Sequence, residues 1–148
     1  MTEKDHLHNG IHINLFLSDR PCLVVGGGKV ATRKILLLLD AGAKVAVVSP
    51  EVCEKLGELI ERGLVTHTVR RFEDHDIAGA TIVYAATNSR GINKHVLECC
   101  REKGVLCCCV DGNWSESDFP PPAPTRFNEL TVSVSSGGND CRQSKLVK

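Results

Sequence analysis

The feature that most constrains this chain is an apolar segment that stops at three consecutive glycines and restarts with helical spacing. The sequence CLVVGGGKVA occupies residues 22–31. Glycine has no side chain, so a strand–turn–helix of this kind lets backbone N–H groups and the positive end of a helix approach an anion. Gly26, Gly28 and Ala31 match the pattern Gly-x-Gly-x-x-Ala. We therefore predict a dinucleotide diphosphate site, with an ordinary helix cap as the alternative.

Apolar segments alternate with helical patterns along most of the chain. Strand-like segments without polar interruption are typical of a parallel sheet that is buried on both faces. The pattern predicts an α/β fold of Rossmann type, a doubly wound parallel sheet with helices on both faces. The expected strands are 21–25, 45–48, 65–69, 81–86 and 105–110, the expected helices are 30–39, 51–62 and 91–103, and 70–77 is expected to be a charged loop.

Composition excludes two classes of protein. The formal net charge is zero over 148 residues, which argues against a general nucleic-acid binder. No apolar run approaches the ~20 residues that a membrane span needs. The amino-terminal residues are polar and carry His6, His8 and His12 rather than a signal-like segment. We therefore expect a cytoplasmic protein that binds neither nucleic acid nor membrane.

Eight cysteines are present, and none of them forms a Cys-x-x-Cys pair. Three are consecutive, at 107–109, within an expected strand, where adjacent side chains point to opposite faces. They cannot all chelate one ion, so buried reduced thiols are the preferred interpretation and a metal or cluster role is the alternative. The histidines are dispersed without a ligand motif. We therefore assign no metal ligands.

Polar or small residues follow the expected strands, at the edge where open α/β sheets bind ligands. Ser49 and Pro50 follow the second strand, where Rossmann enzymes usually place an acid for the ribose, so the residues leave NAD and NADP both open. Thr87 and Asn88 follow the fourth strand. Asp111 ends the last strand, where it is either a base or part of an Asp-Gly turn.

Composition changes at Trp114, after which the chain is polar and rich in proline. The segment Leu130–Val134 alternates like a strand before two serines and two glycines. We expect a Rossmann domain over residues 1–113 and a second segment over 114–148 that is too short to fold alone. Pairing with the same segment of another subunit would bury it.

Several of these motifs occur in one order: the glycine turn, Ser-Pro, Ala-Ala-Thr-Asn, Cys-x-Val-Asp and Val-Ser-Ser-Gly-Gly. The series, from about residue 11 to residue 138, resembles the siroheme synthase N-terminal family, the precorrin-2 dehydrogenases. Some members of that family are also sirohydrochlorin ferrochelatases. The resemblance implies a Rossmann domain, a homodimerisation segment and a carboxyl-terminal helical domain. Residues 139–148 depart from the family pattern. On this resemblance we expect most of the helical domain to be missing, in either a fragment or a short member that completes its site differently.

The implied reaction is the NAD-dependent oxidation of precorrin-2 to sirohydrochlorin, with transient Fe²⁺ as a further substrate in bifunctional members. The resemblance makes Asp111 the proton acceptor. The residues expected to contact NAD are Gly26, Gly28, Lys29, Val30, Ser49, Pro50, Thr87 and Asn88. Those expected to contact the substrate carboxylates are Ser135, Ser136, Gly137 and Arg126, with Arg90, Lys94 and Lys145 as further cations. Two alternatives are an NAD-sensing regulatory domain without catalysis and an inactive remnant.

Overall fold

The computed structural model describes residues 10–111, 116–120 and 123–134. The chain divides into two compact units, Leu15–Phe119 and Met1–Asn14 together with Pro120–Lys148. No helix among the described residues has the length and apolar character needed to cross a membrane.

The larger unit is a five-stranded parallel sheet with the strand order β3-β2-β1-β4-β5. This order matches the first five strands of the Rossmann order 3-2-1-4-5-6, in which the chain crosses back from β3 to place β4 beside β1, and it confirms the predicted fold class. The elements in chain order are β1 (Pro21–Val25), α2 (Lys29–Asp40), β2 (Lys44–Val48), α3 (Glu54–Glu61), β3 (Val65–Thr68), the 3₁₀ helix η1 (Asp74–Ile77), β4 (Ile82–Ala85), α4 (Arg90–Glu102) and β5 (Leu106–Cys109).

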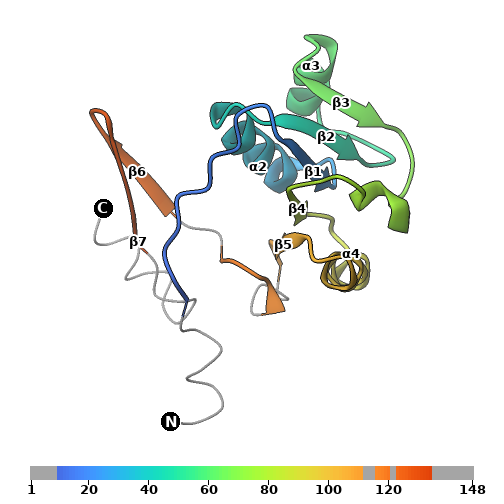
Figure 1. Cartoon of the computed structure of the whole chain (residues 1–148). Helices are drawn as coiled ribbons and strands as arrows, with labels where there is room; N and C mark the ends of the chain where they lie inside the picture. Colours follow the sequence, from blue (N-terminus) through green and yellow to red (C-terminus); the bar gives the residue numbers. More distant parts are fainter. Residues whose placement is uncertain (1–9, 112–115, 121–122, 135–148) are drawn as a thin grey trace. The chain divides into compact units, whose positions relative to one another are not determined.

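Two apolar layers cover the two faces of this sheet. α2 and α3 contribute Ile35, Leu38 and Leu56 to one layer, whereas α4 contributes Val96 and Leu97 to the other. Figure 1 shows α2 and α3 on one side of the strands and α4 on the other. Because successive strand residues face opposite layers, β1, β2, β4 and β5 are largely apolar, as the sequence predicted, whereas the edge strand β3 also carries polar residues.

The consecutive cysteines of β5 follow the same alternation. Cys108 packs in the layer beneath α2 and α3, whereas Cys107 and Cys109 pack in the layer beneath α4. All three are fully buried and carry free thiols. The prediction that they are buried thiols on opposite faces is confirmed.

Residues 117 and 118 cover the outer edge of β5. The Cys109 N–H donates to Ser117 Oγ at 2.8 Å, and the Cys107 N–H donates to an Asp118 carboxylate oxygen at 2.8 Å. The Asp118 N–H in turn donates to the Cys107 carbonyl at 3.0 Å. These contacts satisfy backbone groups that an open sheet edge would leave unpaired.

Two expected boundaries differ from the structure. The helix expected over 51–62 begins only at Glu54, because Ser49 Oγ donates to the Glu51 carbonyl and the Cys53 N–H donates to the Gly27 carbonyl. The charged loop expected over 70–77 contains η1. Asp76 closes that turn by accepting from the Glu73 N–H at 2.8 Å and from Arg70.

The smaller unit contains an antiparallel hairpin of β6 (Ala123–Phe127) and β7 (Leu130–Val134). Asn128 takes a left-handed conformation in the turn, with φ of 55°. β7 coincides with the predicted strand. β6 lies in the part of the chain that the sequence showed only as polar and rich in proline, because Pro124 obscures the strand pattern.

Candidate functional site

The glycine turn joins the ends of three neighbouring strands. The Gly26 N–H donates to the Val48 carbonyl at 3.0 Å, and φ at Gly26 is 129°. A Cβ at Gly26 would lie 2.3 Å from the Ala86 carbonyl oxygen, and one at Gly27 would lie 2.0 Å from that of Glu51. Neither position has room for a side chain. The first two glycines therefore fix the turn against the backbone that follows β2 and β4.

The third glycine of the turn faces open space. A Cβ at Gly28 would meet nothing within 4 Å, and Lys29 and Val30 are exposed. No side chain caps the helix that begins here, and its first turn carries no acid. The first helical hydrogen bond runs from the Thr32 N–H to the Gly28 carbonyl at 3.0 Å, which leaves the earlier N–H groups of α2 pointing out of the helix end. The arrangement fits a diphosphate.

Two backbone carbonyls in the segment after β2 accept side-chain hydrogen bonds that hold this segment in place. Ser49 is buried, and its hydroxyl donates to the Glu51 carbonyl at 2.5 Å. His67, at the end of β3, donates from Nε2 to the Ser49 carbonyl at 2.9 Å. Pro50 and Glu51 are exposed beyond this contact. The outward surface of this segment is therefore formed by Pro50 and Glu51.

A buried asparagine connects the ends of β4 and β5. Asn93 lies in the first turns of α4 with no exposed surface. Its amide nitrogen donates to Asp111 Oδ2 at 2.6 Å and to the Thr87 carbonyl at 3.0 Å. Its side-chain oxygen accepts from the Thr87 N–H at 3.0 Å and from the Thr87 hydroxyl at 2.7 Å. We call Thr87, Asn93 and Asp111 the asparagine junction.

The junction uses all four hydrogen-bonding positions of the Asn93 side chain: two donors and two lone pairs. Such a saturated group has one orientation, because any rotation leaves a buried polar atom without a partner. Asp111 is half-buried at the sheet edge. The junction therefore holds a carboxylate in a fixed position on the same strand edge as the glycine turn. A fixed carboxylate there can accept a proton from a ligand.

Comparison with known proteins identifies the family. Residues 13–123 match the family model described as "Putative NAD(P)-binding". The chain belongs to this family. The membership agrees with the strand order and with the open helix end at Gly28, and the expected dinucleotide-binding Rossmann fold is confirmed.

Relatives of this NAD(P)-binding chain support the resemblance drawn from its motifs. A siroheme synthase of Thioalkalivibrio sulfidiphilus is 40% identical over 132 residues, covering 89% of this chain and 27% of its own length. One of Methylococcus capsulatus is 41% identical over 126 residues, covering 85% and 26%. The chain thus spans about a quarter of these relatives.

A solved structure is similar over a larger share of its length. It is the precorrin-2 dehydrogenase SirC, with a TM-score of 0.80 and 26% identity, and the match covers 93% of this chain and 67% of that one. Together with the siroheme synthases, it confirms the resemblance to the siroheme synthase N-terminal family.

The structure brings together several of the residues that sequence reasoning selected in this NAD(P)-binding chain. The glycine turn contacts Ser49 and the backbone of Ala86, and Thr87 connects through Asn93 to Asp111. Asn88, Arg90 and Lys94 are exposed. Arg126 lies on β6 in the smaller unit and is exposed. The remaining selected residues, Ser135, Ser136, Gly137 and Lys145, lie outside the described part of the chain.

Sequence reasoning missed Asn93. It stands three and four residues before Val96 and Leu97, two apolar residues of the helix expected over 91–103. A polar residue at that helical spacing lies on the apolar face, and burial there requires specific partners. The sequence therefore indicated a buried polar residue at position 93, but it did not indicate the hydrogen-bond partners of that residue.

Proposed function

We propose that this chain catalyses the NAD-dependent oxidation of precorrin-2 to sirohydrochlorin. The observation that carries the proposal is the asparagine junction, which fixes Asp111 at the strand edge that also carries the open glycine turn. The precorrin-2 dehydrogenase SirC and the siroheme synthases support the choice of substrate. A regulatory dinucleotide sensor needs the glycine turn but has no use for a positioned carboxylate.

The residues at the strand ends fit the parts of a dinucleotide. The N–H groups at the start of α2, with Gly28, Lys29 and Val30, bind the diphosphate because glycine leaves the approach open. Pro50, on the outward surface, contacts the adenosine ribose, whereas the ribose contact expected of Ser49 is wrong: this serine is buried, and its hydroxyl donates to the Glu51 carbonyl and so holds the segment in place. Thr87 and Asn88, which follow β4, contact the nicotinamide ribose. The bound NAD⁺ supplies a hydride acceptor.

Asp111 handles the proton of the reaction. Oxidation of precorrin-2 removes two electrons and two protons, which leave as one hydride and one proton. The hydride is taken up as NADH forms, and the proton passes to the Asp111 carboxylate and then to water. Asn93 keeps the carboxylate in place through Oδ2, so that no reorientation is needed when the substrate arrives. Asn93 is a positioning residue, and Asp111 is the catalytic one.

Substrate binding requires cations, because precorrin-2 carries many carboxylates. Arg90 and Lys94, in the first turns of α4, extend from the same helix as Asn93. We assign them, with Arg126, to the substrate carboxylates, and we assign the segment of Ser135, Ser136 and Gly137 to the same role. Arginine suits this role because its guanidinium binds a carboxylate through two hydrogen bonds.

The hairpin supports a homodimer. Phe127, Leu130 and Val132 are 69%, 66% and 53% exposed. An isolated two-stranded hairpin is marginally stable at best in water, and it gains stability by packing its apolar side chains. We assign this surface to self-association. Phe127→Asp should convert a dimer to a monomer in light-scattering measurements at micromolar concentration, while Lys55→Asp on the larger unit should leave the dimer intact.

An anaerobic absorbance assay with precorrin-2 and NAD⁺ tests the function. The unmodified chain should produce NADH together with sirohydrochlorin. Asp111→Asn should lose most of this turnover and keep its affinity for NAD⁺, whereas Glu98→Gln, a surface acid on α4, should retain both. NAD⁺ binding without turnover by the unmodified chain would instead support the regulatory sensor. Adding Fe²⁺ to the product then tests for ferrochelatase activity.

A further inference from the structure

A second cluster of side chains lies between η1 and α4, and the proposed dehydrogenation does not use it. Asp74 belongs to η1, and His95 and Cys99 belong to α4. One ligand atom from each of the three residues lies within 4.8 Å of the others. His95 Nε2 is 2.7 Å from Asp74 Oδ1 and 3.5 Å from Cys99 Sγ. Three different donor types therefore converge on one point.

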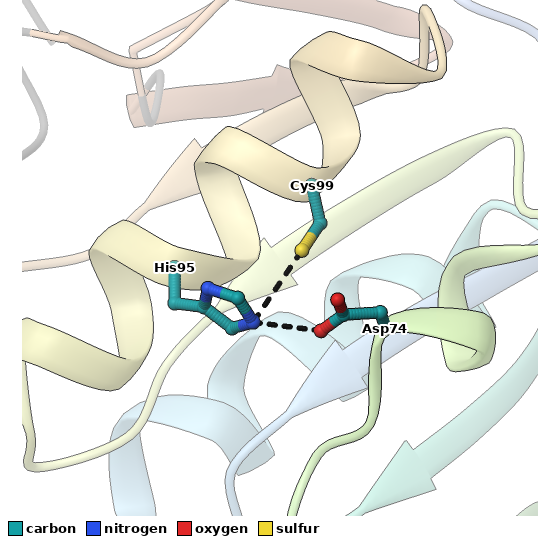
Figure 2. Close-up of side chains that lie close together, drawn as sticks. All are labelled: Asp74, His95 and Cys99. Carbon is teal, nitrogen blue, oxygen red and sulfur yellow. Dashed lines mark hydrogen bonds and ion pairs between the residues drawn. The ribbon is translucent and has the colours of Figure 1, made fainter.

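The helix and η1 together explain this convergence. His95 and Cys99 are four residues apart, so their side chains lie one above the other on the same face of α4. η1 then places Asp74 opposite them, as Figure 2 shows. The Phe72 ring packs edge-on against the His95 ring with centroids 6.1 Å apart and helps to fix its plane. The site is thus built by packed elements rather than by one mobile loop.

The geometry argues against a nucleophilic triad. In such a triad the thiol and the carboxylate contact opposite nitrogens of the imidazole, so that the acid orients the ring while the ring accepts the thiol proton. Here both contacts end at Nε2, as Figure 2 shows. The carboxylate therefore competes with the thiol for one ring nitrogen. That arrangement suits a cation that accepts an electron pair from each of the three ligand atoms, the carboxylate oxygen, the imidazole nitrogen and the sulfur.

We propose that Asp74, His95 and Cys99 form a binding site for a divalent transition-metal ion of the Zn²⁺ type. Thiolate, imidazole and carboxylate are the three ligand types that proteins offer to Zn²⁺. A nitrogen and a sulfur bound to the same tetrahedral zinc lie about 3.6 Å apart, and the observed distance is 3.5 Å. A zinc-bound nitrogen and oxygen lie about 3.3 Å apart, so the exposed Asp74 carboxylate must move outward by roughly half an ångström.

Exposure of the cluster leaves room for an exchangeable fourth ligand. Asp74 and His95 are exposed, whereas Cys99 is buried. Three protein ligands with access to water are typical of zinc sites that exchange a water or a substrate atom, whereas structural sites have four protein ligands. The ion thus reaches the site from solvent and does not require unfolding of the helix. Residues beyond these three need not contribute.

Proton release accompanies binding. Burial, and next the hydrogen bond with Asp74, raise the pKa of the Cys99 thiol to about 11. Glu102 and Cys100 act in the same direction, whereas Lys103 helps to lower the pKa of Asp74. Zn²⁺ binds cysteine as the thiolate, so the bond between the ion and Sγ replaces the bond between Sγ and its proton.

Titration of the full reduced chain with Co²⁺ tests the site, because cobalt bound to a thiolate gives a near-ultraviolet charge-transfer band. We expect the band to saturate at one equivalent and Zn²⁺ to abolish it by displacement. Cys99→Ser should eliminate it, and His95→Gln and Asp74→Asn should each weaken binding, by more than about 100-fold for the ring ligand. His75→Gln and Glu98→Gln are matched surface controls and should leave binding unchanged.

Two further variants keep the result unambiguous. A chain with His6, His8 and His12 changed to Gln should bind as before, because these histidines are not ligands. Cys53→Ser should also keep the band. The proposal is overturned if no thiolate band appears, if the band survives Cys99→Ser, or if it disappears with the three amino-terminal histidines. Since the readout needs neither NAD⁺ nor precorrin-2, its failure leaves the dehydrogenase proposal standing.

Discussion

Asn93 donates a 2.6 Å hydrogen bond to Asp111, reaching from the first turns of α4 to the residue that follows β5 by two positions. The same amide group donates to the Thr87 carbonyl at the end of β4. One buried side chain therefore sets the distance between two neighbouring strand ends. If either end moves, the asparagine loses a partner in a place that water does not reach.

Replacing this asparagine should reduce turnover more than cofactor binding. We expect Asn93→Ala to lower kcat at least tenfold, about 1.4 kcal/mol of transition-state stabilisation, with KM for NAD⁺ little changed. The loss of partners for Thr87 should also reduce the free energy of unfolding by about 1–3 kcal/mol. Steady-state kinetics and urea unfolding measure the two effects. Glu98→Ala on the outer face of α4 is the control, and a proportional loss of NAD⁺ affinity would contradict the assignment.

Substitution by alanine should affect stability at one of two adjacent glycines and NAD⁺ binding at the other. Gly27→Ala places a methyl 2.0 Å from the Glu51 carbonyl oxygen, and we expect it to destabilise the chain by about 3 kcal/mol or to prevent folding. Gly28→Ala meets no atom within 4 Å, so the melting temperature should be unchanged. At the proposed diphosphate site its methyl would obstruct the ligand, so NAD⁺ binding measured by calorimetry should weaken. Unchanged NAD⁺ affinity in Gly28→Ala would place the diphosphate elsewhere.

Acid stability should depend on Asp76. Two hydrogen bonds from the Arg70 guanidinium, at 2.6 and 2.8 Å, lower the pKa of this carboxyl below its ordinary value of 3.8. A carboxyl whose pKa is lower in the folded than in the unfolded state stabilises the fold fully at pH values above its unfolded-state pKa. This stabilisation disappears as the pH falls through the folded-state pKa. Asp76→Asn should therefore be less stable than the unmodified chain at pH 7.

The difference between the two chains should shrink towards zero as the pH falls from 3.8 through the lowered folded-state pKa, where the unmodified carboxyl also becomes protonated. Urea unfolding followed by circular dichroism at several pH values measures it. Glu61→Gln, an exposed acid on α3, is the control and should match the unmodified chain throughout. A difference that stays constant with pH would mean that Asp76 acts by shape rather than by charge.

Cys53 should be the most reactive of the described thiols. A hydrogen bond with Thr32, with an Oγ–Sγ distance of 3.3 Å, lowers its pKa despite partial burial, and backbone N–H groups at the start of α3 act in the same direction. Alkylation by iodoacetamide, followed by peptide mass analysis, should label Cys53 before Cys22 or Cys99. Thr32→Val should slow this labelling and Thr32→Ser should preserve it. Equal rates in both variants would show that the hydroxyl does not act on the thiol.

The fold was predictable because its signals are local and repeated. The strands β1, β2, β4 and β5 are short, largely apolar segments, and glycines with positive φ follow three of the helices, at Gly42, Gly63 and Gly104. Ser89, a residue type that commonly caps helices, caps α4, and its Oγ accepts from the Ile92 N–H at 3.2 Å. These features act within a few residues of the chain, so the sequence alone contains them.

The unpredicted features depend on contacts between distant segments. The late start of α3 follows from the Gly27 carbonyl, which accepts from Cys53. The asparagine junction joins residues 18 positions apart, and the Asp74 contact to His95 spans 21. His95 and Cys99 do have helical ligand spacing, but the third ligand becomes visible only when η1 packs on α4. Pattern reasoning has no access to such pairings before the topology is known.

Because the buried thiols of the sheet lie in two layers, the rates at which they are chemically modified would report how each layer opens. Cys108 and Cys22 belong to the layer under α2 and α3, whereas Cys107 and Cys109 belong to the layer under α4. A reagent can reach any of them only after the covering helix detaches or the whole unit opens. Matching modification rates on the two sides would identify a single cooperative transition. Unequal rates would show which helices detach first from the sheet, and the measurement would need only the cysteines already present.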